Sequence, residues 1–316
     1  MVSLKHNKNN KTVEILVNNQ LFTTYNYSDT LYKPCFFPVY SAGGNMVCRG
    51  FPLAPKPFER IDHPHHTGMW MAFGDVNGID FWNNSYAIPD SAKNKYGRIK
   101  TKSILTKKYS DFLSELIVEN EWITHTGIVL LVEKTIFTFR CAENFRWIKC
   151  QSKLTSKTNE VIFEDSKEGL FAIRLATELE TPTNELTLRL DDKKILTPLP
   201  INYQENITGQ YQNSEGNVGE LECWGKSAKG ACVTGSIGNE TITIYLIDNQ
   251  NNFGTPAHFH TRGYGLFSIN SLGSKHFNDT KKIQLRLSKN QSKTFEYQLI
   301  INSSQPSNIF DNFYFH

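Results

Sequence analysis

Apolar and polar residues alternate along most of the chain with a period of two, which predicts β-strands. Residues 12–25 contain two such runs joined by an Asn-Asn pair, and this dipeptide is typical of tight hairpin turns. Residues 230–248 predict a second hairpin around a Gly-Asn pair. Residues 281–302 predict a third, which turns at Lys289 and Asn290. Almost no segment keeps the period of a long helix.

Residues 115–140 predict three more strands, with turns near Asn120 and Gly127. Many strands and few helices indicate an all-β protein, and one large β-sandwich domain over residues 1–316 explains the pattern best. Two smaller β-barrels in tandem are the alternative. The richest loop region is residues 181–220, and long loops in compact domains are more often functional than idle.

The composition limits the classes of partner. Of the 316 residues, 39% are hydrophobic, so a large core is possible. The net charge of +3 argues against nucleic acid as a partner, because phosphate-binding surfaces need a strong basic excess. One basic stretch, residues 93–108, has the spacing of an exposed strand and loop, and we interpret it as a solvated surface.

Targeting signals are weak in this sequence. No apolar run reaches the ~18 residues that a membrane span needs, and no apolar leader follows the N-terminus. Six cysteines occur without a C-x-x-C pair, which is typical of reduced, buried thiols. We therefore expect a cytoplasmic protein without a membrane partner. The sequence indicates no oligomeric state.

The candidate chemistry begins with "DHPHHTG", which places His63, His65 and His66 within four positions. In an extended segment, His63 and His65 share one face. Such an H-x-H pair can bind a metal ion, or it can supply a general acid and a hydrogen-bond donor. Buried histidines with a purely structural role are the third interpretation.

A second cluster, "HFHTRGYG", contains another H-x-H pair, His258 and His260, followed by Arg262. An arginine beside histidines suits an anionic or oxyanionic ligand group. In a third cluster, "EDSKEG", Lys167 and Glu168 precede a clear strand. A carboxylate beside a lysine can be a general base with a tuned pKa, and a solvated charged turn is the plainer interpretation.

These blocks, together with "YKPCFFPVYSAGG", "CRGFP", "GDVNGIDFW" and "CWGKSAKG", resemble the PmoA-like domain family of bacterial proteins over residues 32–273. The resemblance implies a large β-supersandwich similar to that of aldose mutarotases, a role in carbohydrate metabolism and a pocket formed by the three clusters. An acidic residue expected at the position of Gly263 is absent, which leaves one pocket carboxylate in doubt.

The resemblance and the clusters together predict acid/base chemistry on a sugar or keto-sugar: epimerisation, elimination or hydrolysis. Glu168 is the expected base and His65 the expected acid, and Arg262 and His260 are expected to stabilise developing negative charge. The expected substrate-binding residues are His63, His66, Lys167, Arg49, Trp82 and Lys226. No cofactor is favoured.

Two other functions stay open. A metal-dependent oxygenase or isomerase of the bicupin type would bind a divalent metal through His63, His65 and His260, although the glutamate that cupins place after H-x-H is missing. A non-catalytic carbohydrate-binding protein would use Trp70, Trp82 and Trp224 as platforms.

Overall fold

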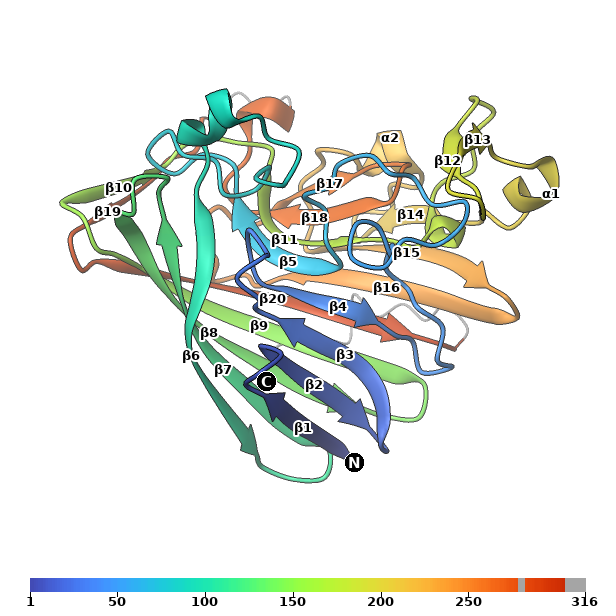
Figure 1. Cartoon of the computed structure of the whole chain (residues 1–316), viewed down its shortest axis with the longest axis horizontal. Helices are drawn as coiled ribbons and strands as arrows, with labels where there is room; N and C mark the ends of the chain where they lie inside the picture. The colour runs from blue at the N-terminus through green and yellow to red at the C-terminus, as the bar shows by residue number, and fades with distance from the viewer. Residues whose placement is uncertain (278–281, 305–316) are drawn as a thin grey trace.

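Two eight-stranded antiparallel sheets pack face to face in the computed structural model, which describes residues 1–277 and 282–304 (Figure 1). The first sheet contains, in spatial order, β1 (Val2–Asn7), β2 (Thr12–Val17), β3 (Gln20–Asn26), β4 (Cys35–Val39), β5 (Met69–Phe73), β11 (Gly169–Arg174), β18 (Leu266–Asn270) and β17 (His258–Thr261). The second contains β14 (Gln210–Asn213), β15 (Gly230–Ile237), β16 (Glu240–Asp248), β20 (Ser292–Asn302), β9 (Phe145–Ser156), β8 (Val129–Cys141), β7 (Leu113–Ile123) and β6 (Arg98–Lys108).

The remaining elements are short. Two small sheets pair β10 (Glu160–Phe163) with β19 (Leu285–Ser288) and β12 (Leu188–Leu190) with β13 (Leu196–Pro198). The helices of the described residues are η1 (Asp90–Lys95), η2 (Thr177–Leu179), η3 (Lys275–Phe277), α1 (Ile201–Gln204) and α2 (Glu220–Cys223).

The core lies between the two large sheets. Alternate residues of β7 are buried, as the period of two predicts. Phe36 of β4 meets Phe137 of β8 edge to face with ring centroids 4.8 Å apart, and Phe171 of β11 stacks on Tyr297 of β20 at 5.9 Å. The predicted large β-sandwich is confirmed. The double-barrel alternative is wrong, because neither sheet closes on itself.

The hairpins of residues 12–25 and 230–248 form as predicted. The third is wrong as a pair: β19 bonds to β10 and β20 bonds to β9. The turn predicted near Asn120 is also wrong. Asn120 lies inside β7 and is buried, because Glu133 accepts its amide hydrogen bond at 3.0 Å.

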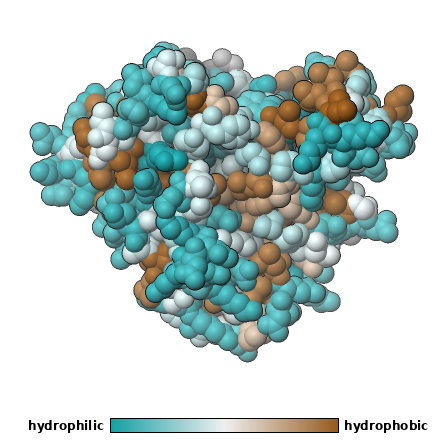
Figure 2. Space-filling view, viewed as in Figure 1, coloured by the Kyte–Doolittle hydropathy of each residue, from teal (hydrophilic) through white to brown (hydrophobic). Residues whose placement is uncertain are grey.

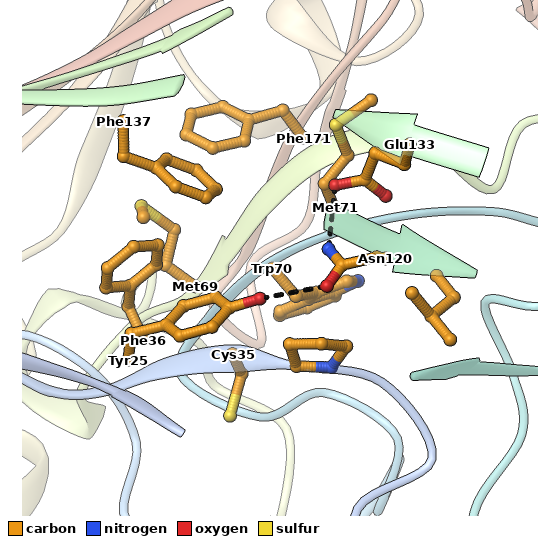
Figure 3. Close-up of a pocket in the computed structure, with 12 residues that line it drawn as sticks. Tyr25, Cys35, Phe36, Met69, Trp70, Met71, Asn120, Glu133, Phe137 and Phe171 are labelled. Carbon is orange, nitrogen blue, oxygen red and sulfur yellow. Dashed lines mark hydrogen bonds between the residues drawn. The ribbon is translucent and has the colours of Figure 1, made fainter. Parts of the chain in front are cut away.

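Glu133 belongs to a polar cluster at a cavity of about 20 Å³ between the sheets (Figure 3). Its carboxylate accepts hydrogen bonds from Asn120, Trp122 and Thr135, with Trp122 Nε1 at 2.7 Å. Burial raises the pKa of Glu133, while the three hydrogen bonds oppose that rise. The cluster satisfies polar groups that the apolar core would otherwise leave unpaired.

Long loops cover the outer face of the first sheet, and the β12–β13 arm with α1 projects at one end of the molecule (Figure 1). The arm carries exposed apolar side chains where Figure 2 shows a hydrophobic patch: Leu186, Leu188, Ile195, Leu196 and Ile201. Within the part of the chain that the structure describes, no helix is long and apolar enough to span a membrane. The prediction of one domain over residues 1–316 stays a prediction, and residues 278–281 and 305–316 lie outside the described residues.

Candidate functional site

The outer face of the first sheet carries a row of side chains that crosses four strands. Ala172 of β11 lies opposite Trp70 of β5 and Ser268 of β18, and Ser268 lies opposite His260 of β17. Residues directly opposite each other in antiparallel strands point to the same face. Phe171 points into the core, so its neighbour Ala172 and the whole row point outward.

Arg174 lies on the same outward face, two residues beyond Ala172, and is fully buried beneath the covering loop. Its Nη2 donates to Asp62 Oδ1 at 2.7 Å, and its Nη1 lies 3.0 Å from His66 Nδ1. Its guanidinium also lies 4.7 Å from the centroid of the Tyr264 ring. Because an arginine only donates, His66 Nδ1 accepts, and the His66 proton is on Nε2.

Asp62 is the shared anion of this arrangement. Its Oδ1 accepts a hydrogen bond from Arg49 Nη1 at 2.7 Å as well as the one from Arg174. Burial raises the pKa of Asp62, but the contact with His63 and the charges of Arg174 and Arg49 outweigh burial and hold the pKa well below its usual range. Asp62 is therefore a fixed negative charge within the loop of residues 60–66, which we call the histidine loop.

Arg49 was expected to bind substrate, and this expectation is wrong because its side chain is fully buried. Its guanidinium donates to the backbone carbonyls of four residues of the loop: Arg60, Asp62, His63 and His66. These bonds fix the path of the loop, including His63 at φ 44°, a conformation that is costly for a residue with a Cβ.

Four rings stack above the sheet. Tyr264 lies 5.0 Å from His63, His63 lies 4.9 Å from His66, and His66 lies 5.2 Å from Trp70, with interplanar angles of 11°, 3° and 20°. Trp82 packs against Trp70 at 5.1 Å and is fully buried. The expected contact of Trp82 with substrate is therefore wrong, since its ring has no surface to offer.

His65 faces a different side of the loop. It lines a cleft of about 230 Å³ together with Lys33 and Tyr32. Lys33 is buried, donates to the Trp82 carbonyl at 2.7 Å, and has its pKa lowered by burial to about 7. Burial, followed by the charge of Lys33, lowers the pKa of His65 to about 2. A ring with so low a pKa is neutral and is a weak general acid.

Glu168 is the partly exposed carboxylate of the site, with 20% of its side chain accessible. Its Oε1 lies 3.8 Å from Lys167 Nζ, a surface lysine with 48% accessibility. Burial raises the pKa of Glu168, the charge of Lys167 lowers it, and the charge of Asp80 raises it, with a net rise. His63 also acts on this pKa, which places the histidine loop within electrostatic reach of Glu168.

His260 completes the outward row and is 4% exposed. Burial, and then the charges of Lys167 and Arg262, lower its pKa to about 3, so the ring is neutral. Its Nδ1 is buried without a hydrogen-bond partner in the described part of the chain. Arg262 is 40% exposed and lies 5.5 Å from the Tyr264 ring and 3.7 Å from Glu220.

The structure therefore brings together residues from all three sequence clusters: His63, Lys167, Glu168, His260 and Arg262. Lys226 is an exposed residue near Phe259, and no contact links its side chain to these groups among the described residues. Sequence reasoning missed Asp62, Arg174 and Tyr264 as parts of the site. A single arginine within the apolar strand "LFAIRLA" was the available signal for Arg174.

Metal binding was an open alternative through His63, His65 and His260. Over residues 1–277 and 282–304, no group of three or more His, Cys, Asp or Glu side chains is arranged to hold a metal ion. The Nδ1 atom of His63 lies 3.3 Å from Asp62, and His65 points to the cleft beside Lys33. The metal alternative stays a prediction.

Solved structures that resemble the chain include sugar-active proteins. The galactosidase domain of an alpha-galactosidase-sucrose kinase is 10% identical, with a TM-score of 0.46 over 95% of this chain and 42% of that chain. A GH36 alpha-galactosidase from Geobacillus stearothermophilus is 10% identical, with a TM-score of 0.44 over 96% and 41%. A galactose mutarotase-like protein from Clostridium acetobutylicum is 10% identical, with a TM-score of 0.36 over 96% and 99%.

The chain spans about two fifths of the length of the two galactosidase structures. No curated protein is significantly similar to it in sequence. The resemblance to the PmoA-like domain family stays a prediction. A family model matches residues 12–308, nearly the whole chain. The chain thus belongs to the family of unknown function DUF6807.

Proposed function

We propose that this chain performs acid/base chemistry on a sugar or keto-sugar at the outer face of the first sheet. The observation that carries the proposal is Glu168, a partly buried carboxylate whose pKa is raised by burial, within electrostatic reach of His63. A carboxyl group with a raised pKa is a stronger base than an ordinary glutamate.

His63 replaces His65 as the proposed acid. Its Nδ1 is buried 3.3 Å from Asp62 Oδ1, so Nε2 is the nitrogen that can face a substrate. Its side chain is 40% exposed, whereas His65 faces the neighbouring cleft and has a pKa near 2. The stacked Tyr264 and the left-handed backbone of His63 fix the ring in place.

The proposed step is removal of an acidified C–H proton next to a keto group. Glu168 takes the proton, the C–H electron pair forms the C=C bond of an enolate, and the carbonyl π electrons move onto the keto oxygen. The carbonyl then re-forms, the enolate C=C pair moves to the bond toward the next carbon, and the oxygen on that carbon departs with its electron pair and takes a proton from His63. Lys167 and Arg262 stabilise the negative charge that develops on the keto oxygen. Reprotonation on the opposite face, without departure of the oxygen, gives epimerisation instead.

A substitution pair tests this proposal. Glu168→Gln keeps the size of the side chain but cannot accept the proton, so turnover of keto-sugars should fall roughly 100- to 10,000-fold. Glu164→Gln is the matched control, because Glu164 lies in the same acidic run but pairs with the exposed Lys282 at 2.9 Å. In the wild type, turnover should fall as the pH drops through the raised pKa of Glu168, above the ordinary value of 4.5.

The measurement is turnover of a panel of aldoses, keto-sugars and keto-glycosides by the three proteins, with melting temperatures recorded alongside. Equal turnover by wild type and Glu168→Gln removes Glu168 from the mechanism. Binding of sugars without turnover by the wild type favours the carbohydrate-binding alternative. Two of the platforms expected for that alternative, Trp70 and Trp82, are buried.

A further inference from the structure

Part of the basic stretch of residues 93–108, which was expected to be solvated surface, lines a second hollow of the molecule. This cavity, of about 380 Å³, is bounded by residues from η1, the start of β6 and the β7–β8 turn. We call it the basic cavity, and its defining residues are Tyr32, Lys93, Arg98, Lys100 and His125. Lys93, Lys100 and His125 are exposed residues around this hollow, whereas Arg98 is half-buried.

Arg98 is held in a defined position in the basic cavity. Its guanidinium lies 4.5 Å from the centroid of the Tyr32 ring. Its Nε is buried without a hydrogen-bond partner in the described part of the chain, and its Nη2 makes a long contact of 3.5 Å with the Asp29 carbonyl. A fixed guanidinium with unused donors is suited to an anionic ligand.

Neighbouring acids do not neutralise the whole cavity. Asp90 pairs with Lys93 at 2.5 Å, and Asp29 pairs with Lys11, which lowers the pKa of Asp29 together with the weaker effects of the Lys100 and Arg98 charges. Glu121 lies opposite Lys100 in the strand register but pairs with Lys102 at 3.4 Å. Over the described residues, Arg98 and Lys100 have no ion pair of their own.

Charges on an edge strand also discourage pairing with another chain, and β6 is an edge strand. That role needs only exposed charge. It accounts for Lys102 and Lys108, which extend along β6 and pair with Glu121 and Asp111. It does not account for the stacking of Arg98 on Tyr32 or for its unused Nε.

The basic cavity adjoins the cleft that contains His65. Tyr32 and Asn84 line both hollows, so the two share a wall. The His65 cleft of about 230 Å³ has room for several water molecules and hence for a small polar ligand group. A ligand that occupies both hollows would lie beside His65 at one end and Arg98 at the other.

We propose that the basic cavity binds the anionic group of an acidic sugar, either a carboxylate or a sulfate ester, and that the substrate is a disaccharide or longer. The sugar part rests on the proposed function, whereas the anionic part rests on Arg98 and Lys100. Arg98 donates in a fork to two oxygens of the anion, and Lys100 adds a point charge.

The test is calorimetric binding of three probes: a digalacturonate, a sulfated disaccharide and a neutral digalactoside. Charge-assisted hydrogen bonds predict that at least one acidic probe binds about 10-fold or more tightly than the neutral one. Arg98→Gln and Lys100→Gln should each remove most of this preference. Lys107→Gln is the matched control, because Lys107 lies on the same strand but does not line the cavity.

Salt should weaken binding of the acidic probe more than binding of the neutral one. The acidic probe that binds more tightly identifies the preferred anion as carboxylate or sulfate. Equal affinity for all three probes, or a preference that survives both substitutions in folded protein, overturns the inference. Glu168→Gln should keep the preference, so loss of the proposed base and loss of the anion site are separate results.

Discussion

Replacing Arg174 by methionine removes the buried cation under the candidate site while keeping a long, flexible side chain. Arg174 has no exposed surface. The substitution deletes the 2.7 Å hydrogen bond to Asp62 and the 3.0 Å contact to His66 Nδ1. Asp62 keeps its bond to Arg49 at 2.7 Å, so the carboxylate loses one of its two cationic partners.

The size of the effect follows from these contacts. Removing one partner of a fully buried ion pair costs about 3–5 kcal/mol. Asp62 is 33% exposed and retains Arg49, so water and the second cation compensate part of the loss. We therefore expect Arg174→Met to lower the free energy of unfolding by about 2–3 kcal/mol, which for a chain of 316 residues corresponds to a fall in melting temperature of roughly 3–5 °C.

The pH dependence gives a second measure. The pKa of Asp62 in the folded protein lies well below the ordinary value of 3.8, so its ionised form contributes stability that is present above that pH and is lost as the pH falls toward the folded pKa. The stability gap between wild type and Arg174→Met should be full at pH 7 and should narrow only below the pKa of Asp62 in the folded variant, which stays under 3.8 because Arg49 remains beside it.

Urea denaturation between pH 2.5 and 7, followed by tryptophan fluorescence, measures this gap. Arg286→Met is the matched control, because Arg286 is 54% exposed and its ion pair with Glu160 lies on the surface. A variant within about 0.5 kcal/mol of wild type at pH 7 refutes the role assigned to Arg174.

Two further substitutions probe buried charges elsewhere. Burial lowers the pKa of Lys33 to about 7 in the folded protein, so between pH 7 and 10 the unfolded chain binds more protons than the folded one and the stability of the wild type rises with pH. Lys33→Met should lose this rise. Parallel profiles of stability against pH for the two proteins contradict the prediction. Glu133→Gln places an amide N–H against one of the three groups that now donate to the carboxylate. The substitution should lower the free energy of unfolding, measured by denaturation, by about 1–3 kcal/mol. Adding Trp122→Phe should recover part of that cost if Trp122 is that donor, and strict additivity of the two changes contradicts this account.

The alternation of residues was enough to predict the strands and the sandwich, because long strands of the second sheet such as β7, β8 and β9 bury alternate residues. It could not predict which strands pair. β19 and β20 follow each other across a short turn, yet β19 bonds to β10 and β20 to β9. Alternation is the same for either partner, so the pattern contains no information on this choice.

The turn predicted near Asn120 was wrong for a related reason. Asparagine is common in turns because its side chain bonds to nearby backbone. In β7 the amide bonds instead to Glu133, which is distant by 13 positions and lies on the neighbouring strand β8. Only the tertiary structure supplies that partner.

The candidate site was predictable in part. The exposed groups, His63, Lys167, Glu168 and Arg262, stand in runs of chemically rich residues, and the sequence pointed to each of them. The supporting residues were harder to predict, because an arginine that holds a loop in place and an arginine that binds substrate look the same in the sequence. Arg49 is of a residue type that often binds ligands, but all the hydrogen bonds of its guanidinium go to the loop that it fixes.

The buried charges beneath the loop also act on two of the three clustered histidines. Arg49 and Arg174 place two positive charges under the loop against the single negative charge of Asp62. The two arginines add to burial in lowering the pKa of His65 and of His66, so these rings stay neutral. His63 alone among the three has its ring nitrogen beside Asp62, at 3.3 Å. The clustered histidines are therefore not equivalent: His65 and His66 are neutral rings suited to packing and hydrogen bonding, whereas His63 lies beside the Asp62 carboxylate.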